Sequence, residues 1–125
     1  MSDIKKPLSY RDLLVWQKSI ALVLEIYTLT AACPAEEKFG LVTQMRRAAI
    51  SIPSNIAEGQ ARHTTSEFIR FIAYAEGSVA ELDTQCIIAE KLLSASSQTF
   101  LEINVALQEI RRLLNALRRS LNSKQ

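Results

Sequence analysis

The chain has 125 residues, of which 48% are hydrophobic and only three each are glycine and proline. This length suits one domain, and so few helix-breaking residues favour long helices over a disordered or many-stranded chain. The net charge of +2 is too small to require an anionic partner, and no apolar run is long enough to cross a membrane. We therefore expect residues 1–125 to form one all-α domain. The N-terminus lacks a hydrophobic stretch typical of a signal peptide, so we expect a cytoplasmic protein.

The first predicted helix covers about residues 10–31 and carries two apolar stripes. One stripe recurs at three- and four-residue steps, which is typical of a helix face packed on a core: Leu13, Trp16, Ile20, Leu24 and Tyr27. The second stripe points away from the first: Val15, Leu22, Ile26 and Leu29. A bundle helix normally exposes its far side to water, so two stripes indicate burial on two sides. The second stripe predicts a contact between subunits of an oligomer or, alternatively, a wide core contact with some exposed aliphatic residues.

The second predicted helix covers about residues 35–61 and contains Pro53 in its interior. Proline has no N–H to donate to the carbonyl of Ala49, and its ring crowds that carbonyl. The apolar stripe nevertheless stays in phase across the proline: Leu41, Met45, Ala48, Ile52 and Ile56. We therefore expect one helix with a kink near Ala49–Pro53.

The third and fourth predicted helices cover about residues 65–94 and 99–120. Thr64 and Glu67 have the spacing of a capping box, which marks the start of the third helix. Gly77 lies in the middle of that helix, where glycine costs roughly 1 kcal/mol relative to alanine, so we expect another helix to approach closely there. The fourth helix has a regular heptad of apolar residues: Phe100, Ile103, Leu107, Ile110, Leu114, Leu117 and Leu121. Four amphipathic helices with short turns predict an antiparallel up-down-up-down four-helix bundle.

Residue patterns typical of catalysis are missing from the sequence. His63 is the single histidine and has no residues at metal-ligand spacing around it. The glycines stand alone, so they form no phosphate-binding loop. We expect no catalytic residues, no metal and no cofactor. An enzyme with an unrecognised site is the third functional hypothesis, after a nucleic-acid-binding protein and a protein–protein adaptor.

The arginines are the remaining candidates for a functional site. On the fourth predicted helix Arg111 lies seven residues before Arg118, and Arg112 seven before Arg119, so each pair shares a helix face. These arginines either pair with acids of the third helix or form a phosphate-binding stripe for RNA or DNA. Arg112 and Arg119 are the stronger candidates, because they point nearly opposite the apolar seam. The second-tier candidates are Arg46, Arg47 and Arg62.

Three segments of the chain, spread over roughly residues 10–93, resemble a known family. They are YRDLLVWQK at 10–18; FGL at 39–41 with QMRRAA at 44–49 and SIPSNIAEG at 51–59; and EGS at 76–78 with EL at 81–82 and TQ at 84–85. These runs resemble the motifs of the four-helix bundle proteins called 23S rRNA intervening-sequence proteins. One departure is Cys33 before Pro34, where the family usually has phenylalanine.

The resemblance implies a bacterial, cytoplasmic four-helix bundle without established catalytic activity. A related group, the accessory variability determinants of diversity-generating retroelements, forms homopentameric barrels with basic surfaces that bind nucleic acid. The resemblance therefore implies a homo-oligomer, with five subunits as the expected number, that binds structured RNA or DNA. The alternative is a protein–protein adaptor that does not bind nucleic acid.

Overall fold

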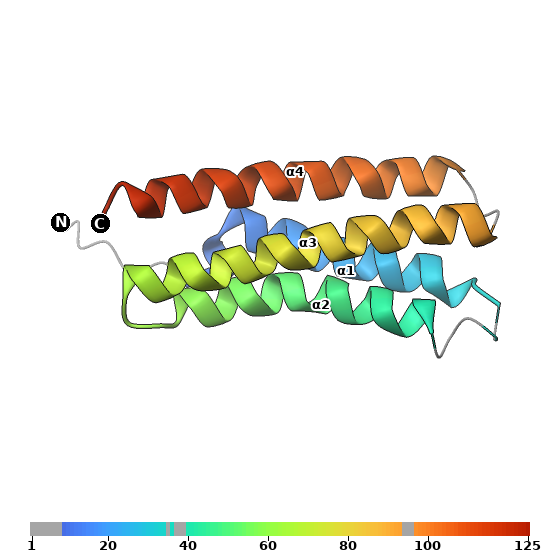
Figure 1. The fold of residues 1–125 in the computed structure, drawn as a ribbon, viewed down its shortest axis with the longest axis horizontal. Helices are drawn as coiled ribbons and strands as arrows, with labels where there is room; N and C mark the ends of the chain where they lie inside the picture. The colour runs from blue at the N-terminus through green and yellow to red at the C-terminus, as the bar shows by residue number, and fades with distance from the viewer. Residues whose placement is uncertain (1–8, 35, 37–39, 94–96) are drawn as a thin grey trace.

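The structure is a computed structural model, and it describes residues 9–34, 36, 40–93 and 97–125. It contains a short 3-10 turn, η1 (Tyr10–Asp12), and four α-helices: α1 (Leu14–Ala31), α2 (Leu41–Gln60), α3 (Thr65–Leu93) and α4 (Ser97–Asn122). No β-strand occurs in these ranges, which confirms the predicted all-α class. Figure 1 shows the four helices lying side by side along the long axis of the molecule.

Each helix packs against the next one in the chain, and α4 packs against α1, so the four helices surround one shared core. Two ion pairs fix the relative direction of α3 and α4. Glu76 pairs with Arg118, and the later Asp83 pairs with the earlier Arg111. The two helices therefore run in opposite directions. In Figure 1 the colour gradient likewise reverses from each helix to the next. None of the helices described is long and apolar enough to span a membrane.

The structure buries the second predicted stripe of α1 and exposes most of the first, although Leu13 and Trp16 of the first stripe are half-buried against the core. Val15, Leu22 and Ile26 are buried in the core of the single chain, and Leu29 packs against that core. Leu24, which the pattern assigned to the core, has 64% of its surface exposed. The predicted subunit contact is therefore wrong for Val15, Leu22 and Ile26, because these residues are buried among the chain's own helices. For the half-buried Leu29 it stays a prediction.

Two hydroxyl groups explain why the sequence pattern was misleading. Ser19 and Thr30 lie on the buried face of α1, where they make that face look less apolar than the opposite one. The Ser19 hydroxyl donates a 2.7 Å hydrogen bond to the carbonyl of Val15, and the Thr30 hydroxyl one of 2.7 Å to that of Ile26. Because both hydroxyls are satisfied within the helix, their burial leaves no unpaired donor.

The described helix α2 begins at Leu41 rather than near residue 35. Gly40 directly precedes it, and residues 35 and 37–39 of the predicted first turns lie outside the described residues. α2 then continues through the buried Pro53 to Gln60. The continuation across the proline agrees with the sequence, whereas the kink itself stays a prediction. The predicted stripe is buried apart from the half-buried Leu41: Met45, Ala48, Ile52 and Ile56.

The start of α3 and the inner face of α4 follow the sequence closely. The Thr64 hydroxyl accepts a 3.1 Å hydrogen bond from the backbone N–H of Glu67, which confirms the predicted cap. In α4 the predicted heptad faces the core, with Leu117 partly buried and the other six residues buried: Phe100, Ile103, Leu107, Ile110, Leu114 and Leu121. Heptad spacing was a reliable guide here because the opposite face of α4 is largely polar.

The close approach between helices occurs at Gly59, not at Gly77. A β-carbon added at Gly59 would lie 2.6 Å from the β-carbon of Phe71 on α3, closer than real β-carbons approach one another. A β-carbon added at Gly77 would meet no atom within 4 Å. The prediction for Gly77 is therefore wrong, and the close approach of α3 lies at Gly59 of α2, near the turn that connects the two helices.

Candidate nucleic-acid interface

Two of the four arginines predicted on α4 are occupied by acids of α3. Arg111 Nη2 lies 3.5 Å from Asp83 Oδ2, and Arg118 Nε lies 3.0 Å from Glu76 Oε1. Arg118 also donates a 2.8 Å hydrogen bond to Asn115 Oδ1. These contacts follow the pairing alternative for Arg111 and Arg118, whose charges hold α4 against α3 and are partly neutralised there.

Arg112 and Arg119 form the exposed basic part of α4. Both side chains are exposed, and neither has a hydrogen bond or ion pair with the rest of the described chain. A separation of seven residues places them on one face, about 10 Å apart along the helix axis. These two guanidinium groups are consequently free to contact phosphates, as their position opposite the apolar seam predicted.

The second-tier candidates divide in a similar way. Arg46 Nε donates a 2.8 Å hydrogen bond to Thr30 Oγ1, and its guanidinium lies 4.3 Å from the ring centre of Tyr27. Arg62 lies 2.7 Å from Glu58 and stacks over Phe71 at 4.8 Å. These two arginines therefore connect parts of the fold.

Arg47, by contrast, is exposed on α2 and has no recorded partner within the described ranges. The ring order of the helices places α2 diagonally across the bundle from α4. Arg47 is thus a separate exposed cation, and it does not extend the pair formed by Arg112 and Arg119.

The outer face of α4 changes character along its length, which the sequence reasoning missed. Leu101 and Val105 are 56% and 61% exposed. They lie on the same face as Arg112 and Arg119, because steps of four and seven residues return to one side of a helix. The four- and seven-residue spacing of these side chains is the signal in the sequence that could have predicted this face. The outer face is apolar toward the N-terminus of α4 and basic toward its C-terminus.

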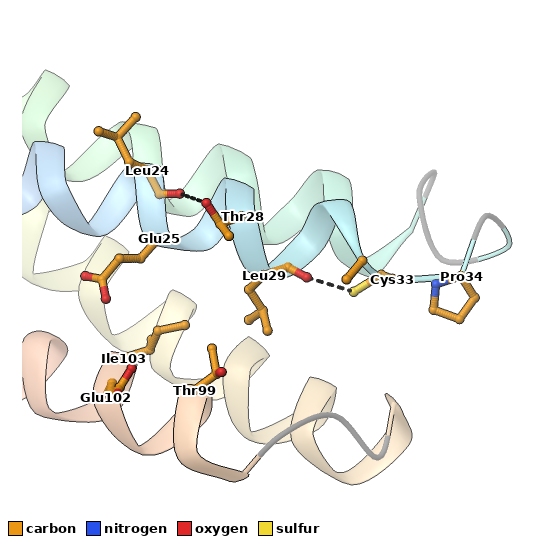
Figure 2. A pocket seen from close by; sticks show the side chains of 10 residues that line it. Leu24, Glu25, Thr28, Leu29, Cys33, Pro34, Thr99, Glu102 and Ile103 are labelled. Atoms are coloured by element: carbon orange, nitrogen blue, oxygen red, sulfur yellow. Dashed lines mark hydrogen bonds between the residues drawn. The ribbon is translucent and has the colours of Figure 1, made fainter.

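A hollow of about 590 Å³ opens between α1 and α4 beside the apolar end of α4. Its wall is formed by residues of both helices and of the turn after α1: Leu24, Glu25, Thr28, Leu29, Ala32, Cys33, Pro34, Thr99, Glu102 and Ile103. Figure 2 shows Glu25 and Glu102 at one end of this hollow, Leu29 and Thr99 in the middle, and Cys33 and Pro34 at the other end. Partial burial raises the pKa of Glu25, and the negative charge of Glu102 raises it further.

Groups with the chemistry of catalysis or metal binding are sparse. Within the described ranges, no three His, Cys, Asp or Glu side chains are grouped so that they could hold a metal ion. The Cys86 thiol is buried, and that burial, with Asp83 nearby, raises its pKa to about 12. Because the thiolate is the reactive form, Cys86 is a poor nucleophile near neutral pH. His63 is exposed.

Comparisons with known proteins bear on the family and the fold. A family model described as 23S rRNA-intervening sequence protein matches residues 11–116. Among solved structures, the chain is similar to a protein of unknown function from the S23 ribosomal protein family of Bacteroides thetaiotaomicron VPI-5482. The two chains are 21% identical with a TM-score of 0.75, and the match covers 83% of this chain and 97% of the other. At this identity the likeness supports the fold alone. No match was found among curated proteins.

Proposed function

Since the chain belongs to the 23S rRNA-intervening sequence protein family, we propose that it is a non-enzymatic, oligomeric helical bundle that binds structured RNA or DNA through exposed arginines. The resemblance of its motifs to that family is confirmed by the match over residues 11–116. We also propose that the helices follow an up-down-up-down order and that the protein is bacterial and cytoplasmic. Membership in a family does not by itself assign a function, so the proposal depends on the arginines of α4.

The observation that carries the proposal is the contrast between the two pairs of arginines. Arg111 and Arg118 are held by acids of α3, whereas Arg112 and Arg119 are exposed without a partner in the described chain. Free guanidinium groups on one helix face suit contacts with the phosphates of a nucleic-acid backbone. Such contacts carry no sequence information, so we expect weak sequence preference and strong dependence on salt.

An oligomer would turn this small basic patch into an effective binding surface. One subunit offers two unpaired arginines on α4, but several subunits present them together, and linked contacts strengthen one another. Apolar residues on the outer face of α1 support an assembly, although not the residues that the sequence predicted: Leu14, Ile20, Leu24 and Tyr27 are exposed. We propose a homo-oligomer whose number of subunits, five, follows only from the resemblance to the related pentamers.

Paired substitutions with equal charge change test the role of α4. The variant Arg112→Gln with Arg119→Gln removes the unpartnered cations, and Arg111→Gln with Arg118→Gln is the matched control. Affinity for an RNA hairpin and a DNA duplex is measured by fluorescence anisotropy over a range of KCl concentrations. We expect the first variant to bind more weakly and to flatten the plot of log affinity against log salt by about 1.8 for each contacting subunit on a duplex, and the control to change little.

The mass of each variant in solution is measured by light scattering, so that a loss of assembly is not mistaken for a loss of contacts. If the first variant keeps the affinity and the salt slope of the parent, α4 does not contact nucleic acid. A parent protein that is monomeric at tens of micromolar contradicts the oligomer.

A protein–protein adaptor is the second candidate function. The observation in its favour is the exposed apolar end of α4, because Leu101 and Val105 suit a protein partner better than a phosphate backbone. This candidate takes precedence if the parent binds neither RNA nor DNA at low salt.

A further inference from the structure

The hollow between α1 and α4 has two chemically different ends. Toward Cys33 and Pro34 the wall includes the apolar residues Leu29 and Ala32, with Leu29 in the middle of the hollow, whereas Ile103 lies beside the glutamates in Figure 2. Two carboxylates, Glu25 of α1 and Glu102 of α4, stand together at the opposite end. A hollow with an apolar body and one charged end discriminates among small molecules by both shape and charge.

The charged end is negative and is not balanced by a recorded ion pair. Neither Glu25 nor Glu102 pairs with a cation of the described chain, and Glu102 accepts only a 3.1 Å hydrogen bond from the amide of Gln98. The nearby Lys18 is engaged by Glu109 at 3.3 Å. The pKa of Glu25 is raised mainly by its partial burial and further by the negative charge of Glu102, so the two carboxylates repel each other. A cation placed between them would relieve that repulsion.

The geometry points to a binding site for a small amphipathic organic cation, with its ammonium or guanidinium group between Glu25 and Glu102 and its apolar part along Leu29 and Ile103. The hollow of about 590 Å³ falls within the range of roughly 300–1,000 Å³ typical of small-molecule sites. The six steps from Glu25 to Ala31, the last residue of α1, correspond to about 9 Å along the helix, which accommodates a chain of six carbons behind the charged group.

This site is separate from the arginines proposed to bind nucleic acid. The hollow lies against the N-terminal part of α4 and its charge is negative, whereas Arg112 and Arg119 lie on the outer face of the C-terminal part. A cationic ligand and a phosphate backbone therefore have different places on the same helix, and each can be tested without the other.

Three probes of equal chain length separate the contribution of charge from that of apolar contact. Hexylammonium, 1-hexanol and hexanoate are titrated into the full-length protein, and binding is followed by methyl and amide chemical shifts in NMR. We expect hexylammonium to shift the signals of Leu24, Leu29 and Ile103, and to bind about tenfold more tightly than 1-hexanol, because only the ammonium group carries a positive charge that attracts both carboxylates. Hexanoate should bind least. Butylammonium should bind severalfold more weakly than hexylammonium, since it buries less apolar surface.

The variant Glu25→Gln with Glu102→Gln keeps the size of both side chains and removes their charges. It should abolish the preference for hexylammonium over 1-hexanol, whereas the control Glu90→Gln, on α3, should leave that preference intact. Both glutamates are exposed, so the double variant is expected to fold, and its amide spectrum verifies this. The site is refuted if 1-hexanol binds as tightly as hexylammonium to the parent, if the double variant keeps the preference, or if the shifted signals lie away from α1 and α4.

Discussion

The two ends of α4 share one backbone conformation and one kind of buried face, yet they present opposite chemistry to solvent. Toward the N-terminus the outer face carries Leu101 and Val105, and hollows open on both sides of the helix, one against α1 and one against α3. Toward the C-terminus the outer face carries Arg112 and Arg119, and Arg118 is tied to Glu76 of α3.

This comparison separates what builds the bundle from what the bundle offers to other molecules. The heptad of α4 continues without interruption beneath both ends, from Phe100 to Leu121. Because the inner face satisfies the core, the outer residues can vary independently of it. The apolar end and the basic end are therefore expected to contribute little to stability and to differ mainly in what they bind.

The largest expected effect is a loss of stability, and it comes from substitutions in the core beneath both ends of α4. Leu107→Ala under the apolar end and Leu114→Ala under the basic end should each lower the free energy of unfolding by about 2–5 kcal/mol, because both remove fully buried methyl groups. Urea denaturation followed by circular dichroism measures this. Leu101→Ala, on the exposed face, is the control and should cost far less. A Leu114→Ala variant as stable as the parent would mean that the core ends before the basic part of α4.

An intermediate effect is expected from making the apolar end resemble the basic end. Leu101→Lys with Val105→Lys adds two cations in line with Arg112 and Arg119, so the salt slope for duplex binding should steepen by about 1.8 for each contacting subunit. Leu101→Gln with Val105→Gln is the control, since it adds polarity without charge. An unchanged slope at unchanged oligomer mass would show that nucleic acid reaches only the C-terminal end of α4.

The smallest expected effect concerns the acid beside the apolar end. The pKa of Glu25 is raised in the folded protein, so the folded state holds its proton more tightly than the unfolded state does. Stability contributed by that proton is present at pH values below the unfolded pKa and is lost as the pH rises through the folded pKa. Glu25→Gln should remove this slope in the pH interval just above the ordinary glutamate pKa of about 4.3, and should change stability at pH 7 by less than about 0.5 kcal/mol, as is usual for exposed sites.

The measurement for Glu25 is the pH dependence of the urea midpoint. The matched control is Glu90→Gln, which makes the same substitution at an exposed acid on α3. If the parent and the Glu25 variant show the same dependence over this interval, the charge of Glu25 is not disfavoured by folding.

The sequence was sufficient for the class and number of the helices, because period and capping are local properties of the chain. It was sufficient for the inner face of α4, because the heptad runs unbroken from Phe100 to Leu121, whereas the outer side has Leu101 and Val105 followed by arginines. It failed on α1, where both faces are apolar and the buried one contains Ser19 and Thr30. Hydropathy counts a hydroxyl as polar even where it is satisfied by the carbonyl four residues earlier in the same helix.

The candidate sites likewise divide into those that local spacing could predict and those that depend on how two helices pack. Helix spacing was enough to separate Arg112 and Arg119 from Arg111 and Arg118, because it places them on different faces of α4. The contacts of Arg46 with Thr30 and Tyr27 could not be foreseen, since they join residues of two helices whose relative rotation the sequence leaves open. The hollow between α1 and α4 depends in the same way on how two helices meet.

The contact at Gly59 has a consequence for which substitutions the chain can accept during evolution. Even the smallest side chain at this position would meet Phe71 at a β-carbon that the backbone holds in place, so α3 would have to move away from α2. The same helix carries Glu76 and Asp83, which hold Arg118 and Arg111. A variant at position 59 would therefore weaken the pairing of Arg111 and Arg118 indirectly, by shifting the acids of α3 that contact them. Gly77 is under no such constraint, so substitutions should be tolerated at Gly77 and selected against at Gly59.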